Sequence, residues 1–496
     1  MTMRALHHLP SHLGIERGHL TIDGRDTVAL AAGHGSPLFV FSARRIAANA
    51  GGFLAAARQG HPRAAVFFAS KACSNLHVLR VIRGQGLGVE VNSGGELWKA
   101  LAAGFAPQQI VFNGVAKTAV ELGEAIGRGI KCINVDSAFE LQRIATVAGG
   151  LGRRASVALR VVPGIGGGAT VGLQTGNAAS KFGMTEPELQ VALAFARDHS
   201  NSLDVAGMHL HIGSQILAAA DFAASVAFAA RMGREIGAAL GAKLRHLNLG
   251  GGYPVDYAHL DPKGNREHAA ALHSFSAEDP AAPMVGRVAA QAARELGGDT
   301  EILFEPGRSL VADAAILLSQ VENTRRRGEL PWLYLDAGYN LLIDSAAVRW
   351  YYHMVNAGRM DDAADTGFRM VGPLCDSADC FYDVEGEYLW KAVSSRLADL
   401  PAERLADLRA EIVRLPETRD LPAATAPGDL IALLDTGAYA LGEMFQYCGR
   451  QRAKAIMIDA QGGIVTLRER DRPQDLIDRA EHAAADPAVL ANPTPV

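Results

Sequence analysis

A lysine at the end of an apolar run is the residue with the clearest chemical potential in this sequence. Ala64–Ala69 is apolar, Ser70 and Lys71 follow it, and a helical pattern opens near Asn75. We interpret the run as a buried strand that carries Lys71 at its C-terminal end. Loss of solvation favours a neutral amine, and a neutral amine is what Schiff-base chemistry requires. An ordinary ion pair at a strand end is the competing interpretation.

Three further patterns place polar groups directly after apolar runs. Gly250–Gly252 permits positive φ and could present amides to an anion, or form only a tight turn. Glu305 and Arg308 could bind a ring nitrogen and a phosphate, or each other. His209 and His211 face one side of a strand, where a ring-stacking or structural imidazole is favoured over a metal pair because no third ligand accompanies them. Lysine, anion cradle, carboxylate and imidazole together suit pyridoxal phosphate, whose ring acts as an electron sink when its nitrogen stays protonated.

The elements that must position these groups alternate regularly. Near-continuous apolar strands separated by amphipathic helices are typical of a parallel sheet, and eight such units predict a closed (β/α)8 TIM barrel. A doubly wound open sheet would need a glycine-rich dinucleotide turn, which we do not find. Barrel active groups follow the C-terminal ends of strands, as Lys71, Glu90, His211 and Glu305 do. The predicted strands are 64–70, 86–91, 109–114, 131–137, 154–163, 203–213, 244–252 and 301–308.

The two ends of the chain predict a second, all-β domain. His19–Ile22 followed by Asp23-Gly24 is a hairpin signal, and Pro37–Phe41 is a further strand. A helix is expected over 42–59. The later strands are expected at 314–322, 332–337, 368–373, 381–390, 429–435 and 453–459. The predicted divisions are N-terminal strands 1–40, a barrel 41–310, a β domain 311–474 with a helical insert 391–425, and a partly disordered tail 475–496.

Composition narrows the function classes. The 496 residues are 49% hydrophobic and 20% charged, which allows a large core and more than one domain. A net charge of -5 gives no reason to invoke nucleic acid or an anionic membrane. We see no transmembrane run and no secretory signal. The five cysteines follow no disulfide or zinc spacing, so reduced thiols and a cytoplasmic location are expected.

These motifs resemble the fold type III, alanine-racemase-like pyridoxal phosphate decarboxylases, the group of diaminopimelate and eukaryotic-type ornithine decarboxylases. The resemblance covers roughly residues 35–385 and 427–460. It is carried by Phe68-Ala69-Ser70-Lys71, Ser93-Gly94-Gly95-Glu96, His209-Leu210-His211-Ile212-Gly213-Ser214, Gly250-Gly251-Gly252, Glu305-Pro306-Gly307-Arg308, Gly372-Pro373-Leu374-Cys375-Asp376 and Gly437-Ala438-Tyr439.

The resemblance implies roles for the matched residues. Lys71 would hold pyridoxal phosphate as a Schiff base, His211 would lie over its ring, and Glu305 would bind the pyridine nitrogen. Cys375 would protonate the decarboxylated carbon from the other subunit of a head-to-tail homodimer, so a monomer should be inactive. Glu90 replaces an aspartate usual in the family and keeps its charge. The phosphate would be held by Ser214, Gly250, Gly251, Gly252, Arg308 and Tyr439.

The far end of the substrate is where the sequence departs from diaminopimelate decarboxylases. Those enzymes usually follow the cysteine with Glu, and an arginine in the segment matching 340–344 pairs with the distal carboxylate. Here the positions are Asp376 and Asp344, two acids that would attract a distal cation. The main prediction is α-decarboxylation of an ornithine- or lysine-like amino acid to CO₂ and an amine, with Tyr439 also near the substrate. Segments 336–352 and 372–376 also resemble bacterial enzymes that act on D-ornithine and D-lysine, so chirality is unassigned.

Several alternatives stay open. Arg349 could still reach a carboxylate, which keeps meso-diaminopimelate decarboxylation in lysine synthesis as a rival. The insert 391–425 could shape a partner surface, which suggests a specialised decarboxylase, or a decarboxylation-coupled transaminase, acting on a conjugated or carrier-protein-bound amino acid. A non-catalytic binding protein of the same fold and a racemase are also considered, although Lys71 and Cys375 argue for decarboxylation.

Overall fold

The computed structural model describes residues 9–165, 176, 180–255, 257, 281–397, 399–477 and 481, which fall into two compact units. The barrel unit contains described residues 45–255 and 281–311. The β unit contains residues 9–44, Tyr257 and the described residues from 312 onward. Within these described ranges, no helix is both long and apolar enough to cross a membrane.

Eight parallel strands close a barrel, which confirms the predicted fold class. Ring closure comes from β5, which pairs with β6 on one side and β12 on the other. Every residue of β6, β7, β8 and β11 is buried, as expected of parallel strands that are covered on both faces. The strands are β5 (Ala64–Ala69), β6 (Gly88–Val91), β7 (Ile110–Phe112), β8 (Cys132–Val135), β9 (Ala155–Arg160), β10 (Leu203–His209), β11 (His246–Asn248) and β12 (Glu301–Phe304).

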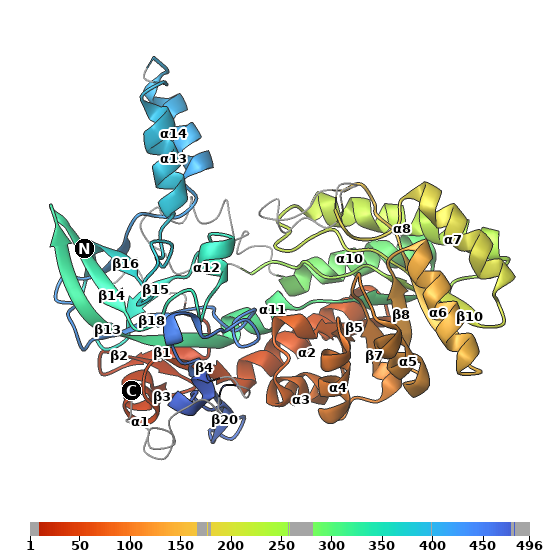
Figure 1. Ribbon diagram of the computed structural model, residues 1–496, viewed down its shortest axis with the longest axis horizontal. Coiled ribbons are helices and arrows are strands. Elements are labelled where there is room, and N and C mark those ends of the chain that lie inside the picture. The colour runs from red at the N-terminus through yellow and green to blue at the C-terminus, as the bar shows by residue number, and fades with distance from the viewer. Residues whose placement is uncertain are drawn as a thin grey trace. The chain divides into compact units, whose positions relative to one another are not determined.

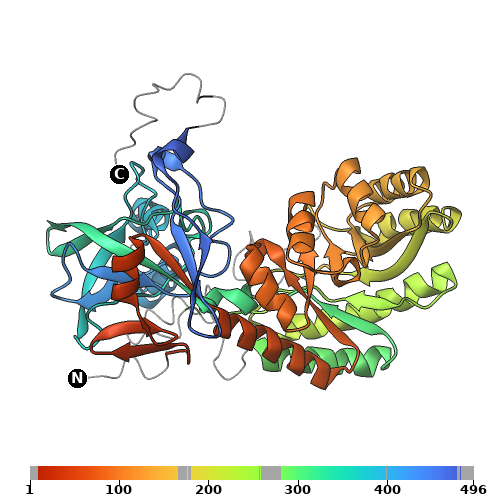
Figure 2. The same cartoon turned by 90° about the horizontal axis from the view of Figure 1, so that it is seen from below.

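Helices surround the barrel strands (Figures 1 and 2). Several begin at a side-chain cap that directly follows a strand-end loop: Asn75, Ser93, Thr118 and Ser137 each accept a backbone N–H. Such caps are each worth about 1 kcal/mol and fix where the loop ends. The helices are α2 (Ala43–Gly60), α3 (Leu76–Gly84), α4 (Gly94–Ala102), α5 (Ala119–Arg128), α6 (Ala138–Gly150), α7 (Glu186–Asp198), α8 (Ala219–Leu240), α10 (Ala281–Leu296) and the short α11 (Arg308–Val311).

The β unit joins the two ends of the chain in one sheet. Strand β4 (Leu38–Ser42) pairs antiparallel with β13 (Ala315–Arg327) and parallel with β19 (Lys454–Ile458). The sheet order is β17-β16-β14-β13-β4-β19-β20, with β18 beside β13 and β15 beside β18. Its other strands are β14 (Leu330–Leu335), β15 (Met354–Asn356), β16 (Ala364–Val371), β17 (Arg419–Pro422), β18 (Leu430–Leu433) and β20 (Ile464–Arg468); the short helices α1 (Thr27–His34) and α12 (Asp344–Ala347) accompany them.

The N-terminal hairpin forms as predicted. Strands β1 (Leu13–Glu16), β2 (His19–Ile22) and β3 (Arg25–Asp26) form a small antiparallel sheet. Asp23 and Gly24, between β2 and β3, have φ of 48° and 74°. Positive φ at both central residues matches the right-handed twist of a two-residue hairpin, which is why Asp-Gly is favoured there.

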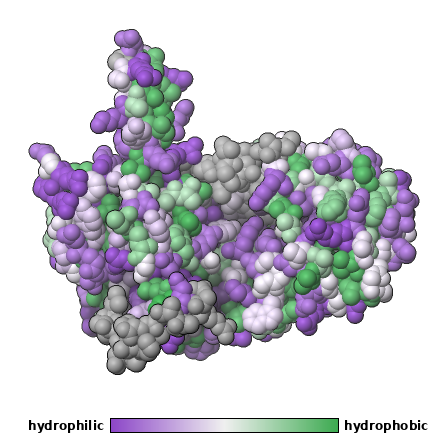
Figure 3. All heavy atoms as spheres, in the orientation of Figure 1, coloured by the Kyte–Doolittle hydropathy of each residue, from purple (hydrophilic) through white to green (hydrophobic). Residues whose placement is uncertain are grey.

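The predicted strand at 381–390 is wrong. Helix α13 (Val384–Ser394) occupies this segment and forms a hairpin with α14 (Ala402–Ile412). Asp383 caps α13 by accepting the Gly386 amide at 2.8 Å, and a side-chain cap of this kind fixes the start of a helix. The hairpin projects from its sheet (Figure 1), and Figure 3 shows both hydrophobic and hydrophilic residues along it. The predicted tail 475–496 lies outside the described residues from 478 on, except Glu481.

Candidate active site

The C-terminal ends of the barrel strands bring most of the predicted residues into one cluster. Lys71 follows β5 in a short 3₁₀ turn, Ser70–Ala72. After burial, its positive charge is the next cause that lowers the pKa of His211, and it partly offsets the rise that burial and Glu305 cause in the pKa of Glu90, which places the three groups within electrostatic reach of one another. Lys71 is exposed in the barrel unit rather than buried, so the expectation that apolar neighbours desolvate it is wrong. The apolar strand ends at Ala69, and in the following turn Ser70 and Ala72 are buried while Lys71 between them is exposed.

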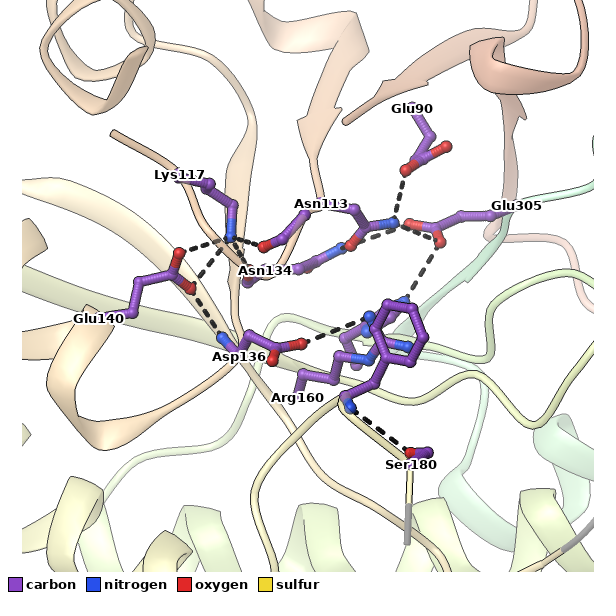
Figure 4. Close-up of polar contacts among 12 residues, drawn as sticks. Glu90, Asn113, Lys117, Asn134, Asp136, Glu140, Arg160, Ser180 and Glu305 are labelled. Carbon is purple, nitrogen blue, oxygen red and sulfur yellow. Dashed lines mark hydrogen bonds and ion pairs between the residues drawn. The ribbon is translucent and has the colours of Figure 1, made fainter. Parts of the chain in front are cut away.

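Glu305 is the most extensively hydrogen-bonded carboxylate of this cluster. One oxygen accepts the side-chain amides of Asn248 at 2.6 Å and Asn134 at 3.3 Å. The other accepts Asn113 Nδ2 at 2.9 Å and contacts His209 Nε2 at 3.2 Å. Figure 4 shows Asn113 between this carboxylate and Glu90. Burial alone would raise the pKa of Glu305, but His209 and the amide donors lower it to about 2, so the carboxylate is ionised.

Glu90 is buried beside Glu305 and titrates in the opposite direction. One of its oxygens accepts Asn113 Nδ2 at 2.7 Å, while the other has no hydrogen-bond partner among the described residues. Burial, reinforced by the negative charge of Glu305, raises the pKa of Glu90 to about 8. Two neighbouring carboxylates therefore have different protonation states at neutral pH, because one has four N–H partners and the other has one. The assumption that Glu90 simply keeps the family aspartate's charge is not supported by this environment.

The two histidines of the alternating pair occupy different surroundings. His209 is fully buried, and burial lowers its pKa, so a neutral ring donates from Nε2 to Glu305. Burial and then the charge of Lys71 lower the pKa of His211. Its Nδ1 accepts the Gly251 amide at 3.2 Å, which assigns the ring proton to Nε2. Among the described residues, no group of three or more His, Cys, Asp or Glu side chains is placed to hold a metal.

The glycine turn serves close packing. A Cβ on Gly250, Gly251 or Gly252 would overlap backbone atoms at the ends of neighbouring strands. Gly250 and Gly252 have φ of 66° and 96°. The amides of Gly250 and Gly251 already donate, to Asn248 Oδ1 at 2.9 Å and to His211 Nδ1. An anion bound here would compete with those two side chains.

Beyond Glu305 lies a second buried cluster that sequence reasoning missed. Lys117 donates to Glu140 at 3.0 Å and to the Asn134 carbonyl at 2.8 Å (Figure 4). Asp136 lies 3.5 Å from Arg160, whose guanidinium stacks over Phe182 at 4.4 Å. Asn113, Asn134 and Asn248 were also missed. The available signal was an asparagine at the C-terminal end of an apolar strand, where a residue depleted in strands needs a specific reason.

Five of the predicted residues lie in the β unit. Cys375 is exposed. Next to it, Asp376 accepts the Tyr339 hydroxyl at 2.7 Å, and the Ala378 amide followed by this hydroxyl lowers the pKa of Asp376. Arg349 pairs with Asp383 at 2.8 Å and with Glu385. Three other predicted positions are partly or fully buried in their own units: Asp344 and Tyr439 partly in the β unit, and Arg308 fully in the barrel unit.

The barrel residues fit pyridoxal phosphate in charge and chemistry. Glu305 is a buried, ionised carboxylate suited to a protonated ring nitrogen, and the unpaired oxygen of Glu90 offers a second polar contact. A lysine amine, a neutral imidazole and a guanidinium at Arg308 complete a donor set suited to an aldehyde, a flat ring and a phosphate.

The family model, the curated relatives and the solved structures that resemble this chain all belong to one family. Residues 53–312 match the family model for the pyridoxal-binding domain of pyridoxal-dependent decarboxylases. The diaminopimelate decarboxylase of Pseudomonas aeruginosa is 32% identical over 90% of this chain and 93% of its own length, and that of Archaeoglobus fulgidus 29% over 93% and 97%. The crystal structure of the M. jannaschii diaminopimelate decarboxylase in complex with L-lysine superimposes with a TM-score of 0.77 at 27% identity, covering 97% of this chain and 99% of that chain.

Proposed function

Because this chain belongs to the pyridoxal-dependent amino-acid decarboxylases, we propose that it removes the α-carboxylate of an amino acid whose far end carries an ammonium group. The observation that carries this proposal is Asp376. Its carboxylate is held ionised by the Ala378 amide and the Tyr339 hydroxyl, directly after Cys375 in the chain. A fixed anion beside the proposed proton donor suits a substrate with a distal cation.

The chain's own residues divide the work. Pyridoxal phosphate, when bound, supplies an electron sink for the electrons that the departing carboxylate leaves. Lys71 would attach the cofactor through its aldehyde, Glu305 would hold the ring nitrogen protonated, and His211 would lie against the ring. Ser214, Arg308 and Tyr439 would bind the phosphate. Cys375 would return a proton to the substrate carbon after CO₂ has left.

A lysine- or ornithine-like substrate is the first candidate, and Arg349 supports it. The arginine that could have received a distal carboxylate is paired with Asp383 and Glu385. Its backbone has φ of 55°, a conformation uncommon for residues other than glycine, so the local fold constrains its position. With Asp344 also present, this segment is better suited to a distal ammonium than to a distal carboxylate.

meso-Diaminopimelate is the second candidate, and the relatives support it more directly. The two curated relatives and the solved structure described above are all named diaminopimelate decarboxylases. Diaminopimelate also has an ammonium group at its far end, so Asp376 suits both candidates. The D-ornithine and D-lysine assignment, and chirality in general, stay predictions.

We further propose a homodimer with shared active sites. Cys375 is exposed in the β unit, as expected of a residue that serves a neighbouring subunit. Mixing inactive Lys71→Ala protein with inactive Cys375→Ala protein should restore up to about one quarter of wild-type activity if sites are shared between subunits that exchange freely. No recovery under conditions of proven subunit exchange would contradict the shared site.

The test of the main proposal is CO₂ release by cofactor-loaded protein. The panel is L- and D-lysine, L- and D-ornithine, arginine and meso-diaminopimelate, with the organic product identified by mass. Turnover of basic amino acids without diaminopimelate supports the first candidate, and turnover of diaminopimelate alone supports the second. Absence of turnover with the cofactor attached at Lys71 would overturn both and favour a conjugated or carrier-bound substrate.

A further inference from the structure

We propose that Asp379 is a positioning residue that clamps the loop carrying Cys375 and Asp376, and that this clamp sets the efficiency and outcome of proton return. The inference rests on the proposed roles of Cys375 and Asp376. Asp379 lies only four residues beyond the cysteine, is 4% exposed, and has no part in the chemistry described so far.

One carboxylate joins two loops of the β unit. Asp379 Oδ2 accepts the Leu374 amide at 2.7 Å, just before Cys375. Its Oδ1 accepts the Tyr339 amide at 2.8 Å, from the loop after β14. Its backbone closes the same loop, since the Gly372 amide donates to the Asp379 carbonyl at 3.0 Å and the Asp379 amide to the Asp376 carbonyl at 3.1 Å. The chain on both sides of Cys375 is therefore hydrogen-bonded to Asp379.

Two glycines allow the close approach. A Cβ on Gly338 or on Gly372 would overlap the Asp379 carboxylate. Neither glycine has the positive φ that would explain it by conformation alone, so the lack of a side chain serves the packing against Asp379. The clamp therefore depends on three residues: Asp379 and the two glycines that pack against its carboxylate, Gly338 and Gly372.

The clamp also reaches Asp376 through a side chain. Tyr339, whose amide Asp379 holds, donates its hydroxyl to Asp376 at 2.7 Å. The Tyr339 ring is stacked on Tyr447 with centroids 6.1 Å apart and lies 5.9 Å from Phe445. Asp379 therefore fixes both the backbone beside Cys375 and the tyrosine that orients Asp376.

The charge of Asp379 supports a functional reason for its burial. Burial raises its pKa to about 6; the amides of Leu374 and Tyr339 and the charge of Arg450 oppose this, and Asp376 reinforces it. At neutral pH the carboxylate is ionised, which strengthens both hydrogen bonds from the amides. Below pH 6 it becomes protonated, and a neutral acid holds the two amides less firmly.

The test is Asp379→Asn in the cofactor-loaded protein. The amide keeps the size but turns one acceptor into a donor that faces a backbone N–H. We expect kcat to fall about tenfold or more, because small misplacement of a reacting group costs that much. Cofactor attachment at Lys71 should be unchanged. The rate at which iodoacetamide alkylates Cys375, followed by mass spectrometry, should change. A larger share of turnovers should also release an aldehyde instead of the amine product, with the amino group left on the cofactor.

Two further variants make the result decisive. In Gly372→Ala the new methyl group would overlap the Asp379 carboxylate while Asp379 itself is unchanged. This variant should show the same change in Cys375 alkylation rate and in product ratio as Asp379→Asn. Asp429→Asn is the matched control: Asp429 also accepts a backbone amide, from Ala426 at 3.1 Å, and pairs with Arg359. If Asp379→Asn and Asp429→Asn have equal kcat, product ratio and Cys375 alkylation, the clamp is refuted. If wild type releases no CO₂ from any substrate while alkylation still differs between the variants, the proposed function fails and the clamp stands as a positioning device.

Discussion

Glu305 in the barrel unit and Asp379 in the β unit are both buried carboxylates, yet their surroundings drive their pKa values in opposite directions. Glu305 has three asparagine amides and a histidine N–H directed at it, and its pKa falls to about 2. Asp379 has two backbone amides, and its pKa rises to about 6. The number of donors decides whether hydrogen bonding or desolvation dominates.

The difference suggests a division of labour. Donors on rigid strands make a permanent charge, which suits a cofactor whose ring nitrogen must stay protonated. At Asp379 the donors are backbone amides on loops. They hold a carboxylate that can still be protonated, and this suits a loop whose position matters more than its charge.

Lys71→Ala should abolish turnover, with a loss of about 10⁴-fold or more, because the variant lacks the amine proposed to attach the cofactor. The β unit should be unaffected, so the alkylation rate of Cys375 should match that of wild type. Decarboxylation assays measure turnover, and borohydride trapping measures attachment of the cofactor to the protein. Normal activity in this variant would show that the lysine assignment is wrong.

Glu305→Gln should lower kcat by about 10²–10³-fold, since a neutral amide cannot hold a ring cation. Side-chain volume is nearly conserved, so folding should survive. Glu90→Gln is the matched control, because Glu90 is already protonated at neutral pH, with a pKa near 8, and loses no charge on substitution. Equal losses in the two variants would mean that the two carboxylates do not differ in charge.

The pH dependence of stability should carry opposite signatures from the two sites. Glu305 has a depressed pKa, so its contribution is present above pH 4.5 and is lost as pH falls toward 2. Asp379 has a raised pKa, so its ionisation costs free energy that builds between pH 3.8 and 6, on the order of 3 kcal/mol at most. The free energy of unfolding, measured in urea, should fall as pH rises from about 4 to 7 in wild type and in Asp429→Asn. In Asp379→Asn this decline should be absent. A decline that persists in Asp379→Asn would place its source elsewhere.

Much of this division was predictable from sequence, and part of it was not. The barrel, its strand ends and the positions of Lys71, His211 and Glu305 follow from apolar periodicity, which fixes what is buried. The opposite protonation of Glu90 and Glu305 could not be predicted, because it depends on Asn113, Asn134 and Asn248 from three separate strands. The exposure of Lys71 and the helix at 384–394 were missed because a 3₁₀ turn and an Asp383 cap are local features that hydrophobic patterns do not encode.

Asn113→Ala should destabilise the protein by about 1–3 kcal/mol, because Asn113 donates to both Glu90 and Glu305. Glu305 keeps three partners, so cofactor attachment should weaken only modestly. Asn323→Ala, on the exposed end of β13, is a suitable control for the loss of an asparagine. If unfolding of the two variants is the same, the Asn113 bridge contributes little.

Asp344→Arg should have the smallest effect on catalysis and the clearest effect on selectivity. The change lies in the β unit outside the Asp379 clamp and leaves every barrel residue in place, so cofactor attachment and Cys375 alkylation should not move. Replacing an acid with a guanidinium should shift the ratio of kcat/KM for meso-diaminopimelate over lysine by about tenfold or more toward diaminopimelate. Ala347→Arg, at an exposed position in the same short helix, also introduces a guanidinium but changes the net charge by one unit, where Asp344→Arg changes it by two. If both variants shift the ratio equally, the effect comes from overall charge. If Asp344→Arg leaves the ratio unchanged, residue 344 does not face the substrate. The argument for a substrate with a distal cation then rests on Asp376.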